Sequence, residues 1–170
     1  MTIAEARELI APVVLTDGAN QQWADLGCGT GTFSYALATL LPGNSRIVCV
    51  DKELQAIKPL YDGVHLEFNQ ADIQEIDFAP RSLSGILMAN SLHYVKNQPK
   101  FIEQISQFLN SNASFIIIEY DTDVSNQWVP YPLSFNTLSK LFKGYGKVRK
   151  LNERPSIYGS AHLYACQVSR

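Results

Sequence analysis

The chain has 170 residues, of which 46% are hydrophobic and 18% are charged, and its formal net charge is −2. This length suits one domain, and the composition is that of a soluble globular protein. The small net charge argues against a surface built to hold a polyanion such as a nucleic acid. We therefore expect the densest basic segment, residues 143–150, to be a solvated edge.

Three cysteines, Cys28, Cys49 and Cys166, lie in apolar segments or in a glycine-rich turn. Their odd number and apolar surroundings favour buried, reduced thiols in a cytoplasmic protein over a disulfide framework. No apolar run approaches the roughly 18 residues that a membrane-spanning helix requires. The first residues, Met1–Glu8, are polar and acidic, unlike a secretory signal. We expect a cytoplasmic location and no membrane partner.

Apolar runs of strand length alternate with segments of helical periodicity, which predicts βα units and a mainly parallel sheet. We expect strands near residues 22–27, 46–51, 64–69, 84–89 and 113–120, and helices near 3–11, 31–41, 53–60, 98–109 and 134–142. Two further strand-like runs, Tyr145–Glu153 and Tyr158–Val168, predict an antiparallel hairpin. The expected result is one α/β domain over residues 1–170, with a helix or lid within 1–20 and a seven-stranded core over 21–170.

The segment from Trp23 to Tyr35 has the pattern of a buried strand that enters a glycine-rich turn and then a helix. Gly27, Gly29 and Gly31 lack a Cβ, so the backbone can turn sharply there and approach a ligand closely. The helix that follows offers unpaired backbone N–H groups to a polar or anionic ligand. The pattern therefore predicts a ligand-binding turn.

A second acid, Asp51, ends the next apolar run, twenty residues after Gly31. Dinucleotide-binding folds place at this distance a carboxylate that accepts hydrogen bonds from ribose hydroxyls. The hydride-carrier motif G-x-G-x-x-G needs a last glycine for close helix–strand packing, and Thr32 stands at that position. The spacing therefore indicates a nucleoside ligand, and Thr32 argues against a nicotinamide or flavin cofactor.

Joined to Asp25 and Asp51, the Gly27-x-Gly29-x-Gly31 turn resembles the first motif of the class I S-adenosylmethionine-dependent methyltransferases, close to their small type 11/12 branch. The resemblance implies a Rossmann-like, doubly wound sheet that ends in an antiparallel hairpin. It also implies S-adenosylmethionine as the cofactor.

The resemblance extends over most of the chain. Val50–Asp51 matches the ribose-binding end of the second strand, and Asn69–Ile73 matches the adenine-binding turn after the third. Ile86–Tyr94 matches the strand end that faces the methyl group in that family. The match at the glycine turn is highly specific and the match at Val50–Asp51 moderately so, whereas the other two rest mainly on their order and spacing.

The resemblance implies which residues contact the cofactor. The expected cofactor-binding residues are Asp25, Gly27, Cys28, Gly29, Thr30, Gly31, Asp51, Lys52, Asp72, Ile73 and Asn90. The glycine turn would hold the methionine part and Asp25 its ammonium group, while Asp51 would hold the ribose hydroxyls. Asp72 and Ile73 would hold the adenine. Two alternatives stay open, since Asp25 could be a buried capping acid and Asp72 a helix N-cap. Lys52 could equally be surface charge.

Asn90 and His93 are the expected catalytic residues, because they lie where the methyl group would be transferred. Histidine can act as a general base or orient an acceptor, although His93 could equally be a packed residue at the start of a helix. We expect Tyr94 to belong to the core, and we expect no metal ion. The loop Asp121–Leu133, which contains Trp128, could wall an acceptor pocket or pack under the sheet edge.

Ligands of open α/β sheets bind at the carboxyl ends of the strands, so polar residues there should converge on one crevice. The residues expected at those ends are Gly27, Asp51, Asp72, Asn90 and Asp121. The expected reaction is methyl transfer to a small-molecule acceptor by in-line displacement. The alternatives are a macromolecular methyltransferase, a cofactor-binding module without turnover and an NAD-type oxidoreductase.

Overall fold

The computed structural model describes residues 1–15, 20–156 and 161–169, and in these residues eight strands form one sheet. The strands are β1 Gln22–Leu26, β2 Arg46–Asp51, β3 Leu60–Tyr61, β4 Val64–Gln70, β5 Leu83–Ala89, β6 Leu109–Tyr120, β7 Lys147–Pro155 and β8 His162–Ser169. The helices are α1 Ile3–Ile10, α2 Thr32–Ala38, α3 Gln98–Ser106 and α4 Phe135–Leu141, with a short 3₁₀ helix, η1, at Leu92–Tyr94.

The strand order is β3-β4-β2-β1-β5-β6-β8-β7, and the pairs among β4, β2, β1, β5 and β6 are parallel. Strand β8 pairs antiparallel with both β6 and β7, which confirms the predicted hairpin at the end of a mainly parallel sheet. The predicted start of its second strand at Tyr158 lies outside the described residues. The sheet has one strand more than the seven expected, because the two-residue β3 pairs antiparallel with β4.

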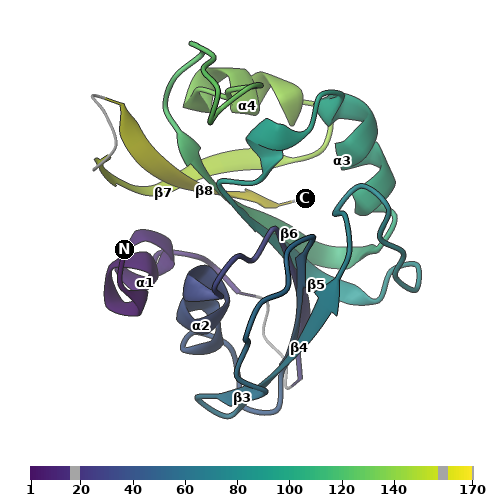
Figure 1. Cartoon of the computed structure of the whole chain (residues 1–170). Helices are drawn as coiled ribbons and strands as arrows, with labels where there is room; N and C mark the ends of the chain where they lie inside the picture. Colours follow the sequence, from purple (N-terminus) through teal and green to yellow (C-terminus); the bar gives the residue numbers. More distant parts are fainter. Residues whose placement is uncertain (16–19, 157–160, 170) are drawn as a thin grey trace.

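Helices cover both faces of the sheet (Figure 1). On one face α1 and α2 pack on a core that includes Trp23 and Ile116, and on the other α3 and α4 pack on a core that includes Phe115 and Phe142. Continuously apolar strands such as the centre of β6 are typical of a sheet that is buried on both sides. The arrangement confirms the doubly wound α/β fold.

The helix expected near residues 53–60 is absent, and that prediction is wrong. Pro59 disfavours helical backbone at Lys58, whose N–H instead donates to the Tyr35 hydroxyl at 2.8 Å. Leu54 is 77% exposed, so the segment has no buried apolar face that would stabilise a helix. As expected, the connection between β4 and β5 also lacks a helix.

Strands β1 and β5 are adjacent at the centre of the sheet, with β2 and β4 on one side of them and β6 on the other. The chain therefore reverses its direction of winding between β1 and β5, and a crevice opens at the carboxyl ends of such strands. The glycine turn after β1 and the residues after β5 lie at this position. Within the described residues, no helix has the length and hydropathy needed to cross a membrane.

Candidate active site

The glycine turn is held in a conformation that other residues adopt poorly. The φ angles of Gly27, Gly29 and Gly31 are +83°, +49° and +81°, all in the left-handed region. A Cβ at Gly27 would lie 2.5 Å from the Cβ of Ser91, which follows β5. The N–H groups of Gly27 and Cys28 both donate to the carbonyl of Val50, at 2.8 and 3.0 Å. The turn is thus wedged between the ends of β2 and β5.

Asp51, at the end of β2, fixes the tip of this turn. Its Oδ2 accepts a hydrogen bond from the Gly29 N–H at 2.8 Å, and its Oδ1 accepts one from the Glu53 N–H at 3.0 Å. A carboxylate oxygen has two lone pairs, so each oxygen keeps capacity to accept another hydrogen bond. The carboxylate predicted to bind ribose therefore also shapes the turn beside it.

A crevice of about 510 Å³ opens in front of the turn. Gly27, Cys28, Gly29, Thr30 and Asn90 line it, so five of the predicted cofactor-binding residues share one cavity. Gly31 lies behind it, where a Cβ would meet Ile57 at 2.8 Å.

The roof of the crevice comes from the N-terminal helix and from β7. The Arg154 guanidinium donates to Glu5 at 3.0 Å, and both residues line the crevice. Glu5 also completes a capping box with Thr2, which lowers the pKa of its carboxyl to about 2, with the Thr2 N–H as the largest cause. Neither Glu5 nor Arg154 was predicted to be part of the site. The Thr2-x-x-Glu5 spacing indicates where the helix begins, but it does not indicate a binding residue.

Asp25 lies beneath the turn and is fully buried. Its Oδ2 accepts a hydrogen bond from the Ser34 hydroxyl, whereas its Oδ1 has no hydrogen-bond partner among the described residues. Burial raises the pKa of this carboxyl to about 7, and the charge of Asp51 adds to the rise while the Ser34 hydrogen bond opposes it. An orphaned buried acceptor with a raised pKa is a feature of binding sites.

The residues predicted to hold an adenine lie together at the ends of β2 and β4. The Ala71 N–H donates to the Asp51 carbonyl at 3.0 Å, and the Gln70 side-chain amide donates to the Lys52 carbonyl at the same distance. Lys52 and Asp72 are exposed, and Ile73 is half-buried. Asp72 accepts a hydrogen bond from the Gln74 N–H at 2.8 Å within a turn, so it caps no helix.

Asn90 ends β5 in a left-handed conformation, with a φ of +54°. Its N–H donates to the Ile118 carbonyl at 2.8 Å, which holds the backbone against β6. Its side-chain Oδ1 is buried, and no residue of the described chain bonds to it. A strained backbone and an unsatisfied buried acceptor at one residue both point to a ligand.

A second cavity of about 750 Å³ adjoins the crevice, since Asn90, Tyr120 and Ser156 line both. Its wall includes Tyr94 and, from the loop after β6, Trp128 and Val129. Tyr94 is 55% exposed, so the expectation that it belongs to the core is wrong. The reason is η1, whose tight turn buries Leu92 and His93 and directs Tyr94 outward.

His93 is buried and also lines the second cavity. Its Nδ1 lies 2.6 Å from Oε2 of Glu119, and its backbone N–H donates to Oε1 at 3.2 Å. Both carboxylate oxygens of Glu119, itself fully buried on β6, thus contact one residue. Glu119 was not predicted, although a single acid that ends the apolar run Phe115–Ile118 was a signal for it.

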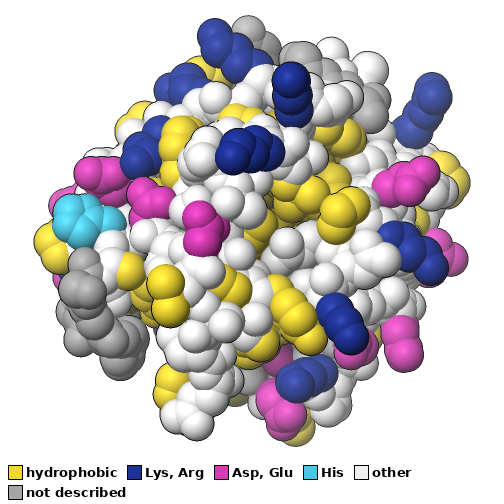
Figure 2. Space-filling model, turned by 90° about the horizontal axis from the view of Figure 1, so that it is seen from above, with side chains coloured by type: hydrophobic (Ala, Val, Ile, Leu, Met, Phe, Trp, Pro, Cys, Tyr) yellow, Lys and Arg dark blue, Asp and Glu magenta, His cyan; other side chains and the backbone are white. Residues whose placement is uncertain are grey.

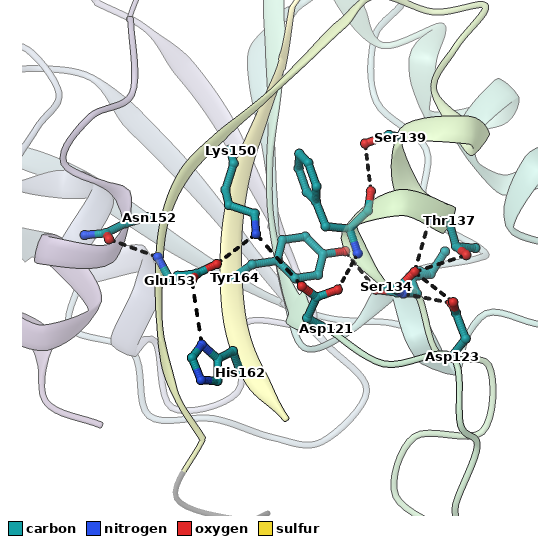
Figure 3. A network of polar contacts seen from close by, with 12 residues as sticks. Asp121, Asp123, Ser134, Thr137, Ser139, Lys150, Asn152, Glu153, His162 and Tyr164 are labelled. Atoms are coloured by element: carbon teal, nitrogen blue, oxygen red, sulfur yellow. Dashed lines mark hydrogen bonds and ion pairs between the residues drawn. The ribbon is translucent and has the colours of Figure 1, made fainter. Parts of the chain in front are cut away.

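Of the five strand-end residues expected to converge on one crevice, Gly27 and Asn90 line it, and Asp51, Asp72 and Asp121 do not. Asp51 still contacts the glycine turn through the Gly29 N–H, whereas Asp121 is bonded elsewhere. Its Oδ1 accepts a hydrogen bond from the Phe135 N–H at 2.8 Å, and its Oδ2 lies 3.9 Å from the Lys150 ammonium (Figure 3). Lys150 also bonds to Glu153 at 2.8 Å. Asp121 therefore anchors the start of α4 to the hairpin, because β6 continues past the crevice before the chain turns.

The arrangement suits a group-transfer site in which one ligand lies against backbone and another against side chains. Among the described residues, no group of three or more His, Cys, Asp and Glu side chains is placed to hold a metal ion. Asn90 lines both cavities and His93 lines the second one, and their side chains can accept a hydrogen bond or a proton.

Several solved methyltransferases share this fold. The 1,6-didemethyltoxoflavin-N1-methyltransferase of Burkholderia thailandensis, solved with 1,6-didemethyltoxoflavin and S-adenosylhomocysteine, is 17% identical, with a TM-score of 0.70, over 99% of this chain and 77% of that chain. The geranyl diphosphate C-methyltransferase of Streptomyces coelicolor is 15% identical, with a TM-score of 0.70, over 98% and 75% of the two chains. A methyltransferase from Aquifex aeolicus is 15% identical, with a TM-score of 0.61, over 89% and 85%. At such identities the similarity is one of fold.

The sequence itself carries the family assignment. A profile of the family described as "Methyltransferase domain" matches residues 17–158, which include the glycine turn and the strands from β1 to β7. A search of curated protein sequences found no match. The profile match covers most of the chain and confirms S-adenosylmethionine as the family's cofactor, against the NAD-type alternative. The chain therefore belongs to the class I S-adenosylmethionine-dependent methyltransferases, as the glycine turn and Asp51 predicted.

Proposed function

We propose that this methyltransferase transfers a methyl group to a small-molecule acceptor that binds in the cavity beside Asn90. One observation carries the proposal: the crevice of the glycine turn and the second cavity meet at Asn90, Tyr120 and Ser156. Two ligands bound in the two cavities would touch at that junction, which is the arrangement that a direct transfer requires.

The residues of the crevice fit S-adenosylmethionine. At Gly27 and Gly29 the backbone has a left-handed conformation in which a residue with a Cβ would be strained, and without a Cβ it is open to a ligand. The Oδ1 atoms of Asp25 and Asn90 are acceptors without a partner in the described chain. We propose that the turn holds the methionine part and that Asp25 attracts its ammonium group, directly or through a water molecule. Asp51 would accept from the ribose hydroxyls.

For the adenine, we propose Asp72 and the Ile73 backbone N–H. In the described residues this N–H donates to no backbone carbonyl, so it is available to a ring nitrogen. Lys52, exposed at the end of β2, would flank the ring.

The bound cofactor supplies an electrophilic methyl group on a sulfonium sulfur. The protein then has to hold the acceptor in line with that methyl group and keep water out, and positioning of this kind can supply roughly 7–11 kcal/mol. Asn90 would orient the acceptor through its Oδ1. His93, fixed by Glu119, would receive a proton where the acceptor carries one.

We further propose that residues 1–20 act as a lid on a single domain that spans residues 1–170. The contact between Glu5 of α1 and Arg154 of β7 supports this, because the pair closes the crevice from above. We propose the cytoplasm as its location, which the three buried free thiols, Cys28, Cys49 and Cys166, support.

A macromolecular acceptor is the main alternative to a small molecule. On the face shown in Figure 2, several Lys and Arg side chains lie in the upper part of the view, with neutral and apolar side chains between them. Within the densest basic segment, Arg149 donates to the Pro12 carbonyl at 2.8 Å and Lys150 to Glu153 at 2.8 Å, so both charges serve internal contacts. These features favour the small acceptor over a nucleic acid.

Transfer of a labelled methyl group tests the proposal. The full chain is incubated with methyl-tritiated S-adenosylmethionine and either the small-molecule or the macromolecular fraction of a cell extract. We expect label in the small-molecule fraction, and no transfer by a Gly27→Val variant, whose turn cannot form. Label only in protein or nucleic acid would contradict the small acceptor. Cofactor binding without any label would favour a binding module.

A further inference from the structure

The second cavity is walled by large apolar groups that lie open to solvent. Trp128 is 70% exposed, Val124 75% and Tyr94 55%, and all three line the cavity. Exposed apolar groups gathered around a hollow mark a binding surface, because a ligand that covers them removes apolar area from water. The flat rings of Trp128 and Tyr94 offer faces on which another flat ring system can stack.

The charge of the wall limits what the ligand can be. None of the described residues that line this cavity is Lys, Arg, Asp or Glu. A carboxylate or phosphate would lose its hydration there with no cation beside it, which is costly. An alkylammonium could lie over the aromatic faces, but in that form its nitrogen has no lone pair for attack. The cavity therefore favours an uncharged ligand.

Among the described residues of the wall, the one basic group is the imidazole of His93, and its orientation is fixed. Glu119 can only accept when it is ionised, so the Nδ1 of His93, 2.6 Å away, carries the proton of the neutral ring. The other nitrogen, Nε2, then keeps its lone pair. Because His93 lines the cavity, Nε2 is the atom that can take a proton from a ligand there.

We propose that the acceptor is an uncharged, planar aromatic molecule with an O–H or N–H group at its edge, and that His93, oriented by Glu119, removes that proton. This inference rests on the proposed function and narrows it. The acceptor oxygen or nitrogen forms a bond to the methyl carbon, while the carbon–sulfur bond breaks and its electron pair stays on sulfur. The proton passes to Nε2, and the imidazolium that forms lies beside the Glu119 carboxylate until water takes the proton. Glu119 is thus a positioning residue.

Four matched fluorescent probes test the acceptor class by binding. Umbelliferone is a planar phenol whose neutral and anionic forms absorb at different wavelengths, and its methyl ether, herniarin, has no acidic proton. Its carboxylate and aminomethyl derivatives add one negative or positive charge to the same ring. Each probe is titrated into the full chain saturated with S-adenosylhomocysteine. We expect both neutral probes to bind at least about tenfold tighter than the charged ones.

Equal or tighter binding of a charged probe would contradict the uncharged acceptor. Failure of both neutral probes to bind would contradict the aromatic acceptor. The affinity for S-adenosylhomocysteine, measured separately by calorimetry, distinguishes the two levels of inference. If that affinity is absent, the proposed function fails, whereas normal affinity without probe binding overturns the acceptor class alone.

The absorbance of bound umbelliferone tests the role of His93. We expect a larger anionic fraction when it is bound than when it is free at the same pH, loss of this increase in His93→Gln and a smaller increase in Glu119→Gln. Herniarin should bind all three proteins equally, which a merely structural defect would not allow. No increase in the wild-type chain would overturn proton removal by His93 even if neither variant folds.

A wall variant and a surface control complete the test. Trp128→Ala should weaken both neutral probes by about tenfold through the loss of ring stacking. Leu60→Ala removes a similarly exposed apolar side chain from β3, outside both cavities, and should leave the affinities unchanged. Equal affinities in Trp128→Ala and the wild type would contradict the stacking surface.

Discussion

The two cavities that meet at Asn90 are built in different ways. The side of the crevice formed by the glycine turn is backbone that the fold holds tightly, with Gly27 against Ser91 and the Gly29 N–H bonded to Asp51. The second cavity is made of side chains, and Trp128 in its wall is 70% exposed. The shape of the crevice is thus fixed by the folded backbone, whereas the second cavity exposes apolar side chains that a ligand can cover.

This difference matches the two tasks of a methyltransferase. A cofactor shared by a whole family can be held by backbone groups whose positions follow from the fold. An acceptor that differs between enzymes has to be selected by side chains on loops, which can vary without disturbing the sheet. We therefore expect substitutions in the glycine turn to affect folding and cofactor binding together, and substitutions in the second cavity to affect the acceptor alone.

The largest effect should come from Gly27→Ala. The new Cβ would lie 2.5 Å from the Cβ of Ser91 at a φ of +83°, so left-handed strain adds to a steric clash. We expect a loss of about 2–5 kcal/mol in the free energy of unfolding, with loss of cofactor binding. Gly29→Ala is the matched control, because its φ is +49° and nothing lies within 4 Å of its Cβ. Chemical denaturation of both variants measures the contrast, and equal losses would show that strain alone matters.

A pH-dependent effect should come from Asp25→Asn. Burial raises the pKa of Asp25 from 3.8 to about 7, so between these values the folded chain keeps a proton that the unfolded chain releases. The stability due to this proton is complete below the lower value and is lost as the pH rises through 7. Asparagine does not titrate, so its stability relative to wild type should increase by roughly 2–4 kcal/mol from about pH 4 to about pH 8.

Denaturation curves of the wild type and Asp25→Asn at several pH values measure this change, and the difference between the two proteins removes the contribution of all other carboxyls. A difference that stays constant with pH would show that Asp25 is ionised in the folded chain over this range.

Asp51→Ala should weaken the cofactor more than it weakens the fold. It removes the acceptor of the Gly29 and Glu53 N–H groups, and with it the charged partner that we propose for the ribose hydroxyls. Hydrogen bonds to a charged group contribute about 1.5–3 kcal/mol each, so affinity for S-adenosylhomocysteine should fall about 100-fold or more. Asp51→Asn, which keeps an acceptor oxygen, should fall less. Normal affinity with a collapsed melting temperature would make Asp51 purely structural.

The smallest effect should come from the roof of the crevice. Arg154→Ala breaks the partly exposed pair with Glu5, and exposed ion pairs contribute little, so the melting temperature should hardly change. Dissociation of S-adenosylhomocysteine should accelerate roughly two- to fivefold, because the roof opens more often. Arg7→Ala is the control, because Arg7 lies on the same helix as Glu5 but bonds to Thr39. Stopped-flow measurements in which both variants release the ligand at the wild-type rate would contradict the proposed role of the N-terminal segment as a lid.

The backbone-built crevice was largely predictable from the sequence. Left-handed glycines and a strand-ending acid leave a local pattern, so Gly27, Gly29 and Asp51 were recognised from residue types and spacing. The bond between Asp51 and the Gly29 N–H was not predicted, because it depends on how β1 and β2 align.

The side-chain-built cavity was much less predictable. The contact of His93 with Glu119 joins residues 26 positions apart, and only the pairing of β5 with β6 brings them together. Tyr94 was expected in the core and Asp121 in the crevice, since a linear pattern does not show which way a side chain leaves a turn. The absent helix near 53–60 was predictable in part, because Pro59 disfavours helical backbone at Lys58. The Tyr35 hydroxyl that accepts the Lys58 N–H is distant in the sequence and could not be predicted.

A crystal structure of the full chain with S-adenosylhomocysteine tests most directly whether the two cavities hold the cofactor and the acceptor. We predict that the methionine part lies in the crevice against Gly27 and Gly29, with the ribose hydroxyls on Asp51. The sulfur should lie beside Asn90, facing the cavity that contains His93 and Trp128. A sulfur directed away from that cavity, or a ligand bound outside the crevice, would contradict the assignment of both sites.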